Sequence, residues 1–165
     1  MGLFARPPVR RRSDGRFTLA IPEEEREVLR SFLEQLRDLL MGEDPLLTRL
    51  FPPAYLRDEQ RDAEYQQLMR GDLLESRFSA IERTQATLDE TVVDEHALTG
   101  WLQSINALRL VVGTRLDAGE EPRRPDPDDP DVALHVLYDH LGWLVMHIVA
   151  ALTEALPPPT DENAR

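Results

Sequence analysis

Three of the four histidines, the side chains best suited to metal binding or proton transfer at neutral pH, fall in one predicted helix near the C-terminus. His140 and His147 are seven residues apart, roughly 10 Å along a helix axis, whereas His135 and His140 are five apart and point to different faces. Two ligands of one metal ion on a helix are three or four residues apart. The spacing therefore favours histidines bonded within the fold, and we expect no metal site.

Carboxylates are abundant, but general acid–base catalysis needs two of them held in a cleft with separated pKa values. Most lie in charge-rich segments such as 23–25, as expected of solvated helix faces. The sequence contains no Gly-rich phosphate loop and no Gly-x-Ser-x-Gly or His-Glu-x-x-His motif. With no cysteine and no lysine, thiolate, Schiff-base and P-loop lysine chemistry are impossible. We therefore expect no enzymatic activity, no catalytic residue and no cofactor.

Arginines cluster at the N-terminus of a chain whose formal net charge is −12. The candidate contacts for a nucleic acid or a protein partner are Arg10, Arg11, Arg12 and Arg16. The acidic remainder would repel nucleic acid, so only this arm is a plausible contact for phosphate. A basic run also suits a protein-docking arm, or an edge strand that needs charge to stay soluble. These three interpretations stay open at the level of sequence.

A second candidate site lies on the helix predicted over residues 97–116. Asn106 and Arg109 are three residues apart on its otherwise apolar surface, where they could contact each other or pair with an acidic neighbouring helix. Three glycines inside predicted helices are expected to let two backbones approach closely: Gly100, Gly113 and Gly142.

Helices must position these side chains, because apolar residues recur at helical spacing over most of the chain. Strand character is confined to residues 4–21, where Asp14-Gly15 predicts a hairpin turn. The helical segments are predicted over about 23–41, 45–50, 58–88, 97–116 and 129–156. The pattern over 58–88 predicts either one helix or two helices that meet near Gly71. The last helix is apolar over most of its circumference and is expected to be the central one.

The predicted fold is mainly α: a single helical bundle of five to six helices with a small N-terminal β-hairpin and no larger sheet. Residues 1–21 form the basic arm, 22–156 the helical body and 157–165 a disordered tail. The expected core is Trp101, Ile105, Leu108, Val112, Leu137, Leu141, Leu144, Val145 and Ile148. No stretch of about 18 uncharged apolar residues and no apolar leader is present, so we expect a cytoplasmic protein without membrane contact.

Three stretches of the sequence carry a family resemblance. They are the stretch 45–55 with its Pro-Pro-Ala-Tyr connector, the stretch from Trp101 through Asn106 and Arg109 to Gly113 within the helix predicted over 97–116, and the segment 133–144. In order and spacing they resemble the AosR-like family of actinobacterial proteins, long labelled a domain of unknown function. The resemblance covers nearly the whole chain. Members of that family are associated with oxidative-stress transcriptional regulation and with cysteine-biosynthesis genes.

The resemblance implies a transcription-associated regulator without enzymatic activity. Its partner would be a sigma factor or another transcription protein, or promoter DNA bound through the N-terminal arm. A thiol switch proposed within the family cannot operate in a chain without cysteine, and His140 stands where a family tryptophan is expected.

The alternative is a protein-interaction adaptor with an acidic helical surface and no DNA binding. Either protein could act as a homodimer. A positive stripe that joins the arm to the body would favour DNA, whereas an isolated arm beside an exposed apolar groove would favour a protein partner.

Overall fold

Gly15 makes the first turn of the chain possible. The computed structural model describes residues 6–117 and 126–154. In it Gly15 has a φ of +81°, a conformation that costs glycine little, and it turns β1 (Val9–Arg11) back onto β2 (Phe17–Leu19). The two strands are antiparallel, with Val9 opposite Leu19. The predicted N-terminal hairpin is therefore confirmed.

The sheet does not stop at this hairpin. A third strand, β3 (Val92–Val93), pairs antiparallel with β2 and places Val93 opposite Phe17, so the strand order is β1-β2-β3. The prediction of no sheet larger than the hairpin is wrong. A strand of two residues is too short to show an alternating pattern, and its partner lies far earlier in the sequence.

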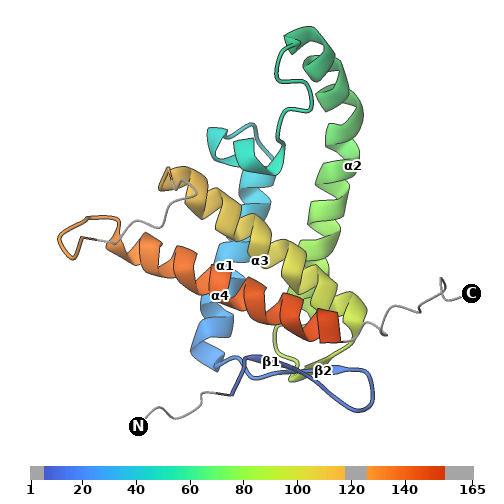
Figure 1. Cartoon of the computed structure of the whole chain (residues 1–165), viewed down its shortest axis with the longest axis vertical. Helices are drawn as coiled ribbons and strands as arrows, with labels where there is room; N and C mark the ends of the chain where they lie inside the picture. Colours follow the sequence, from blue (N-terminus) through green and yellow to red (C-terminus); the bar gives the residue numbers. More distant parts are fainter. Residues whose placement is uncertain (1–5, 118–125, 155–165) are drawn as a thin grey trace, which may run out of the picture.

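The helices account for more than half of the described residues (Figure 1). They are α1 (Glu23–Leu40), the 3₁₀ helix η1 (Pro45–Leu50), α2 (Glu59–Ala86), α3 (Glu95–Arg115) and α4 (Val132–Glu154). The mainly α fold with five to six helices is thus confirmed, with five within residues 6–117 and 126–154. Because α2 is continuous through Gly71, the alternative of two helices is excluded. The predicted end of the last helix and the predicted tail 157–165 lie outside the described residues.

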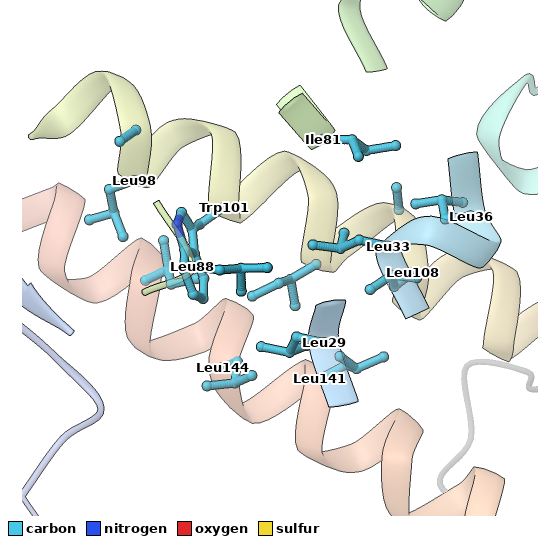
Figure 2. Close-up of a cluster of buried hydrophobic side chains, with 14 of the residues drawn as sticks. Leu29, Leu33, Leu36, Ile81, Leu88, Leu98, Trp101, Leu108, Leu141 and Leu144 are labelled. Carbon is cyan, nitrogen blue, oxygen red and sulfur yellow. The ribbon is translucent and has the colours of Figure 1, made fainter. Parts of the chain in front are cut away.

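The central helix is α3, not α4 as predicted. Eleven residues of α3 are buried, against four of α4, which are Leu141, Leu144, Ile148 and Ala151. Figure 2 shows side chains of α1, α2, α3 and α4 meeting in one cluster. Of the nine predicted core residues, seven are buried and the other two, Leu137 and Val145, pack half-buried against them. The apolar circumference of α4 misled the prediction because its outer side faces solvent.

The N-terminal part of α2 extends beyond this core. None of the residues 59–79 is buried, and Figure 1 shows this part of the helix rising away from α3. The connector after η1 lies along it, because Asp62 Oδ1 accepts hydrogen bonds from the backbone N–H groups of Ala54 (2.7 Å) and Tyr55 (3.2 Å). Gln66 Nε2 also donates to the carbonyl oxygen of Pro52 (3.1 Å). A projecting helix and its connector thus form one surface.

Candidate functional site

Most of the hairpin arginines are bonded within the fold. Asp14, in the turn, accepts hydrogen bonds from Arg12 Nε (3.1 Å), from the backbone N–H of Arg16 (3.0 Å) and from Arg16 Nη2 (3.0 Å). Arg11 Nη1 donates to the carbonyl oxygen of Glu154, at the C-terminal end of α4 (2.8 Å), where a positive charge also suits the helix dipole. Of the four predicted contact residues, only Arg10 has no bonded partner in the described part of the chain.

The bonds to Asp14 give the hairpin a pH dependence. The backbone N–H of Arg16, together with the guanidinium groups of Arg16 and Arg12, lowers the pKa of the Asp14 carboxyl group from 3.8 to about 2. Because the pKa is lower in the folded state, the stabilisation is present above pH 3.8 and is lost as the pH falls through about 2. We expect the carboxyl carbon of Asp14 to titrate by NMR with a midpoint of about 2. In Arg16→Gln the midpoint should move up towards the ordinary value, and an unchanged midpoint would contradict this assignment.

A groove separates β1 from the C-terminal half of α4. It encloses about 320 Å³, with Arg10 and Arg11 on one side and His147 and Ala150 on the other. Figure 1 shows the hairpin below the C-terminal half of α4, while the N-terminal end of α4 points away from it. The basic hairpin is therefore packed beside a helix rather than projecting as a free arm.

The outer face of α4 carries large apolar side chains in contact with solvent. Val136, Trp143, Met146 and Val149 are 61%, 39%, 58% and 44% exposed. By length and composition alone α4 could cross a membrane, a test that the core helix of a soluble protein also passes.

Histidines flank Trp143 on this face of α4. The ring of His140 stacks on Trp143 at a centroid distance of 5.4 Å, and that of His147 meets Trp143 edge-on at 4.7 Å. His140 Nε2 also lies 2.7 Å from Glu25 Oε1 of α1. These two predicted helix histidines therefore contact a tryptophan and a carboxylate. Among residues 6–117 and 126–154, no group of three or more His, Asp or Glu side chains could hold a metal ion.

The second predicted site is not formed as a pair. No hydrogen bond joins Asn106 to Arg109 within the described residues, and Arg109 instead stacks on the ring of Tyr138 from α4, at 4.5 Å. A Cβ atom at Gly142 would lie 3.0 Å from Arg109 Nε, and one at Gly113 would lie 2.8 Å from Tyr138 Cε2. These two glycines make room for side chains, so the expected close approach of two backbones is wrong there.

The third glycine differs from the other two. A Cβ atom at Gly100 would meet the side chain of Arg83 at 3.1 Å and the backbone carbonyl oxygen of Ala80 at 3.4 Å. At this position the backbones of α2 and α3 do come close, as expected.

Sequence reasoning missed a pair of arginines on α2. Arg70 and Arg77, two helical turns apart, both lie over the ring of Phe51, at 4.8 Å and 5.8 Å from its centroid. Arg77 Nη2 donates to the carbonyl oxygen of Leu50 (2.9 Å), its buried Nε has no hydrogen-bond partner, and burial lowers the pKa of its guanidinium group. Neither arginine forms an ion pair with a carboxylate in the described part of the chain. The seven-residue spacing was the available signal.

Hollows lie beside both of these arginines. Arg70 lines an open groove of about 400 Å³ between η1 and the projecting part of α2. Three acidic residues also line that groove: Asp44 and Asp62 accept hydrogen bonds from backbone N–H groups, and Glu43 is the third. Arg77 lines a cavity of about 110 Å³ between α2 and α3, together with the hydroxyl of Ser76 and the amide of Gln103. Guanidinium groups stacked on an aromatic ring are suited to binding carboxylates and phosphates.

Comparison with known protein families gives a match for this chain. Residues 5–152 match a family described as Domain of unknown function (DUF2017). The chain belongs to the DUF2017 family. Comparison with curated proteins and with solved structures finds no match. Because the match covers residues 5–152, the hairpin arginines of this DUF2017 protein and the α2 surface with Arg70 and Arg77 both lie within the family region.

Proposed function

We propose that this DUF2017 protein is a non-catalytic regulator of transcription that acts by binding another protein. The observation that carries the proposal is the pair Arg70 and Arg77, held over Phe51 without a carboxylate partner. The chain has 31 acidic and 19 basic residues, so carboxylates are plentiful. If these two arginines served only the stability of the fold, we would expect them to form ion pairs with some of those carboxylates. Their guanidinium groups are oriented in advance for a carboxylate on a partner, which reduces the entropy lost on binding.

The hairpin supports a protein partner over DNA. Arg12 and Arg16 are bonded to Asp14, and Arg11 is bonded to the end of α4, which leaves Arg10 as the free hairpin guanidinium among the described residues. One phosphate contact contributes little affinity at physiological salt. The hairpin also lies beside the exposed apolar face of α4, and an exposed apolar face favours a protein partner.

The nature of the partner follows from chemistry and from the family resemblance. Arginines without a carboxylate partner can bind an acidic segment, and the resemblance to the AosR-like family supports a sigma factor or another transcription protein as the protein that contains this segment. On the same ground we place the protein in the cytoplasm and link it to oxidative stress and cysteine biosynthesis. Because the sequence contains no cysteine, a thiol of this chain cannot sense the oxidant.

A pull-down with matched variants tests this proposal. Tagged wild type, Arg70→Gln and the double variant Arg70→Gln/Arg77→Gln are incubated with native lysate, with and without nuclease, and bound proteins are quantified by mass spectrometry. We expect a transcription protein that survives nuclease and is depleted about tenfold in the double variant, as for loss of interfacial charges. The control is Arg115→Gln, which removes an exposed arginine without a bonded partner in the described residues.

Two results would contradict the proposal. Equal capture by wild type and by both Arg70 variants would show that these arginines do not bind the partner. Binding of duplex DNA by the purified protein at about 50 mM salt, abolished in Arg10→Ala/Arg11→Ala/Arg12→Ala, would establish the DNA interpretation instead.

A further inference from the structure

The outer face of α4 is nearly free of charge in a strongly charged protein. Charged residues make up 30% of the chain, yet the 23 residues of α4 contain only Asp139 and Glu154 from the set Asp, Glu, Lys and Arg. Four of the nine large apolar side chains exposed in the described residues lie on this helix. Exposed apolar surface that is concentrated on one element marks an interaction site.

The exposed positions of α4 form a single stripe. They are Ala133, Val136, Asp139, Trp143, Met146, Val149, Ala150, Thr153 and Glu154. Steps of three and four residues connect most of these positions, and the adjacent pairs Val149/Ala150 and Thr153/Glu154 widen the surface at the C-terminal end of a helix about 35 Å long. An apolar surface with this spacing packs against another helix. Its occupant is therefore helical.

The stripes of two α4 helices are complementary when the helices run antiparallel. If a second α4 lay antiparallel about a twofold axis midway between Trp143 and Met146, each Trp143 would meet Met146 of the second copy. Asp139 would then lie opposite Ala150, and Val136 opposite Thr153. The central pair joins an indole ring to a thioether, a favourable contact. Neither acidic residue of α4 would lie opposite a carboxylate, because Glu154 would lie opposite His135.

The charges at the two ends of α4 specify the same arrangement. Asp128, Asp129 and Asp131 precede the helix, whereas two arginines, Arg10 and Arg11, and one carboxylate, Glu154, border the groove at its C-terminal half. An antiparallel pair sets the acidic end of each copy beside the basic hairpin of the other, and a parallel pair would set like charges together. Because Ala150 lines the groove together with Arg10, Arg11 and Glu154, Asp139 of the second copy would enter a groove bordered by two arginines and one carboxylate.

We propose that α4 is the interface of a homodimer, in which a second copy of this chain packs its own α4 antiparallel across the stripe and sets its Asp139 beside Arg10. The interface lies on a different element from Arg70 and Arg77, so the two proposals can fail separately.

Oligomeric state tests the apolar part of the interface. Sedimentation equilibrium between about 1 and 100 µM should give twice the monomer mass of 18.9 kDa for the wild type. Met146→Glu should raise the dimer dissociation constant about tenfold or more, because it places a charge in the centre of the stripe. The matched control is Leu68→Glu on α2, where the side chain is 78% exposed and the dimer should persist. A monomeric wild type, or equal effects of the two variants, would overturn the proposal.

A charge exchange tests the orientation. Asp139→Arg alone should weaken the dimer about tenfold, and Asp139→Arg/Arg10→Asp should restore it. Within one chain Asp139 lies eleven residues, about 16 Å, from the level of Ala150, so the restoring contact must form between copies. Failure of the double variant to recover would exclude the antiparallel arrangement.

Other occupants give different results. Flotation of the wild-type protein with vesicles of phosphatidylglycerol and phosphatidylcholine, abolished by Met146→Glu, would assign the stripe to a membrane and overturn the dimer. A wild-type monomer whose captured partner is lost in Met146→Glu, but retained in Arg70→Gln, would assign it to a different protein. Equal folded-state circular dichroism spectra for all variants show that a change of mass is not caused by unfolding.

Discussion

Replacing Arg26 by methionine is expected to lower the free energy of unfolding by about 3–5 kcal/mol. The side chain is only 4% exposed. It donates to the carbonyl oxygens of Leu19 (3.1 Å), Ile21 (2.9 Å), Leu88 and Glu90 (2.9 Å). It thus joins the end of β2 and the start of α1 to the segment before β3. Methionine fills similar space but leaves four carbonyl groups without this donor.

Chemical denaturation followed by circular dichroism measures the loss. Arg26→Lys should recover only part of it, because a single ammonium group cannot reach all four oxygens. The control is Arg30→Met, one turn later on α1. Arg30 donates to Asp89 at 2.6 Å at the surface, where a salt bridge contributes about 0–1 kcal/mol. Equal denaturation midpoints for the Arg26 and Arg30 variants would show that Arg26 does not hold these segments together.

The burial of Arg26 could have been predicted from sequence, although its partners could not. The apolar stripe of α1 is Leu29, Leu33, Leu36 and Leu40, and one more step of three towards the N-terminus reaches Arg26. An arginine at a core position needs several acceptors. Those acceptors are backbone oxygens from segments far apart in the chain, and no local pattern reveals them.

The same distinction explains the rest of the fold. The helices follow from local periodicity, and Asp44, Asp58 and Asp94 cap their first turns as capping rules predict. Whether α4 is central or has an exposed side depends instead on how many other elements pack against it. Its sequence is apolar all round, yet only one side meets the core, so hydrophobicity alone could not separate a central helix from one with an open face.

The candidate site was predictable where residues act locally and not where they act through tertiary contacts. The arginine cluster of the hairpin is visible in the sequence, and so is Asp14 beside it. Arg70 and Arg77 lie on α2, whereas the Phe51 ring that they contact follows η1. Arg109 lies on α3, whereas the Tyr138 ring on which it stacks belongs to α4. Side-chain spacing gives the contacts that are possible, and packing between elements selects among them.

Trp101→Ala is expected to destabilise the fold by about 3–5 kcal/mol, because a fully buried ring leaves a cavity that the surrounding helices fill only in part. Trp101 Nε1 also donates to Thr87 Oγ1 (2.9 Å), at the C-terminal end of α2, and that hydroxyl donates in turn to the carbonyl oxygen of Arg83 (2.9 Å). Trp101→Phe keeps most of the apolar ring and loses this hydrogen bond, so it should cost less. Unfolding must be followed by circular dichroism, since exposed Trp143 is then the remaining tryptophan. If alanine and phenylalanine had equal effects, the hydrogen bond, and not the packing of the ring, would hold α2 to α3.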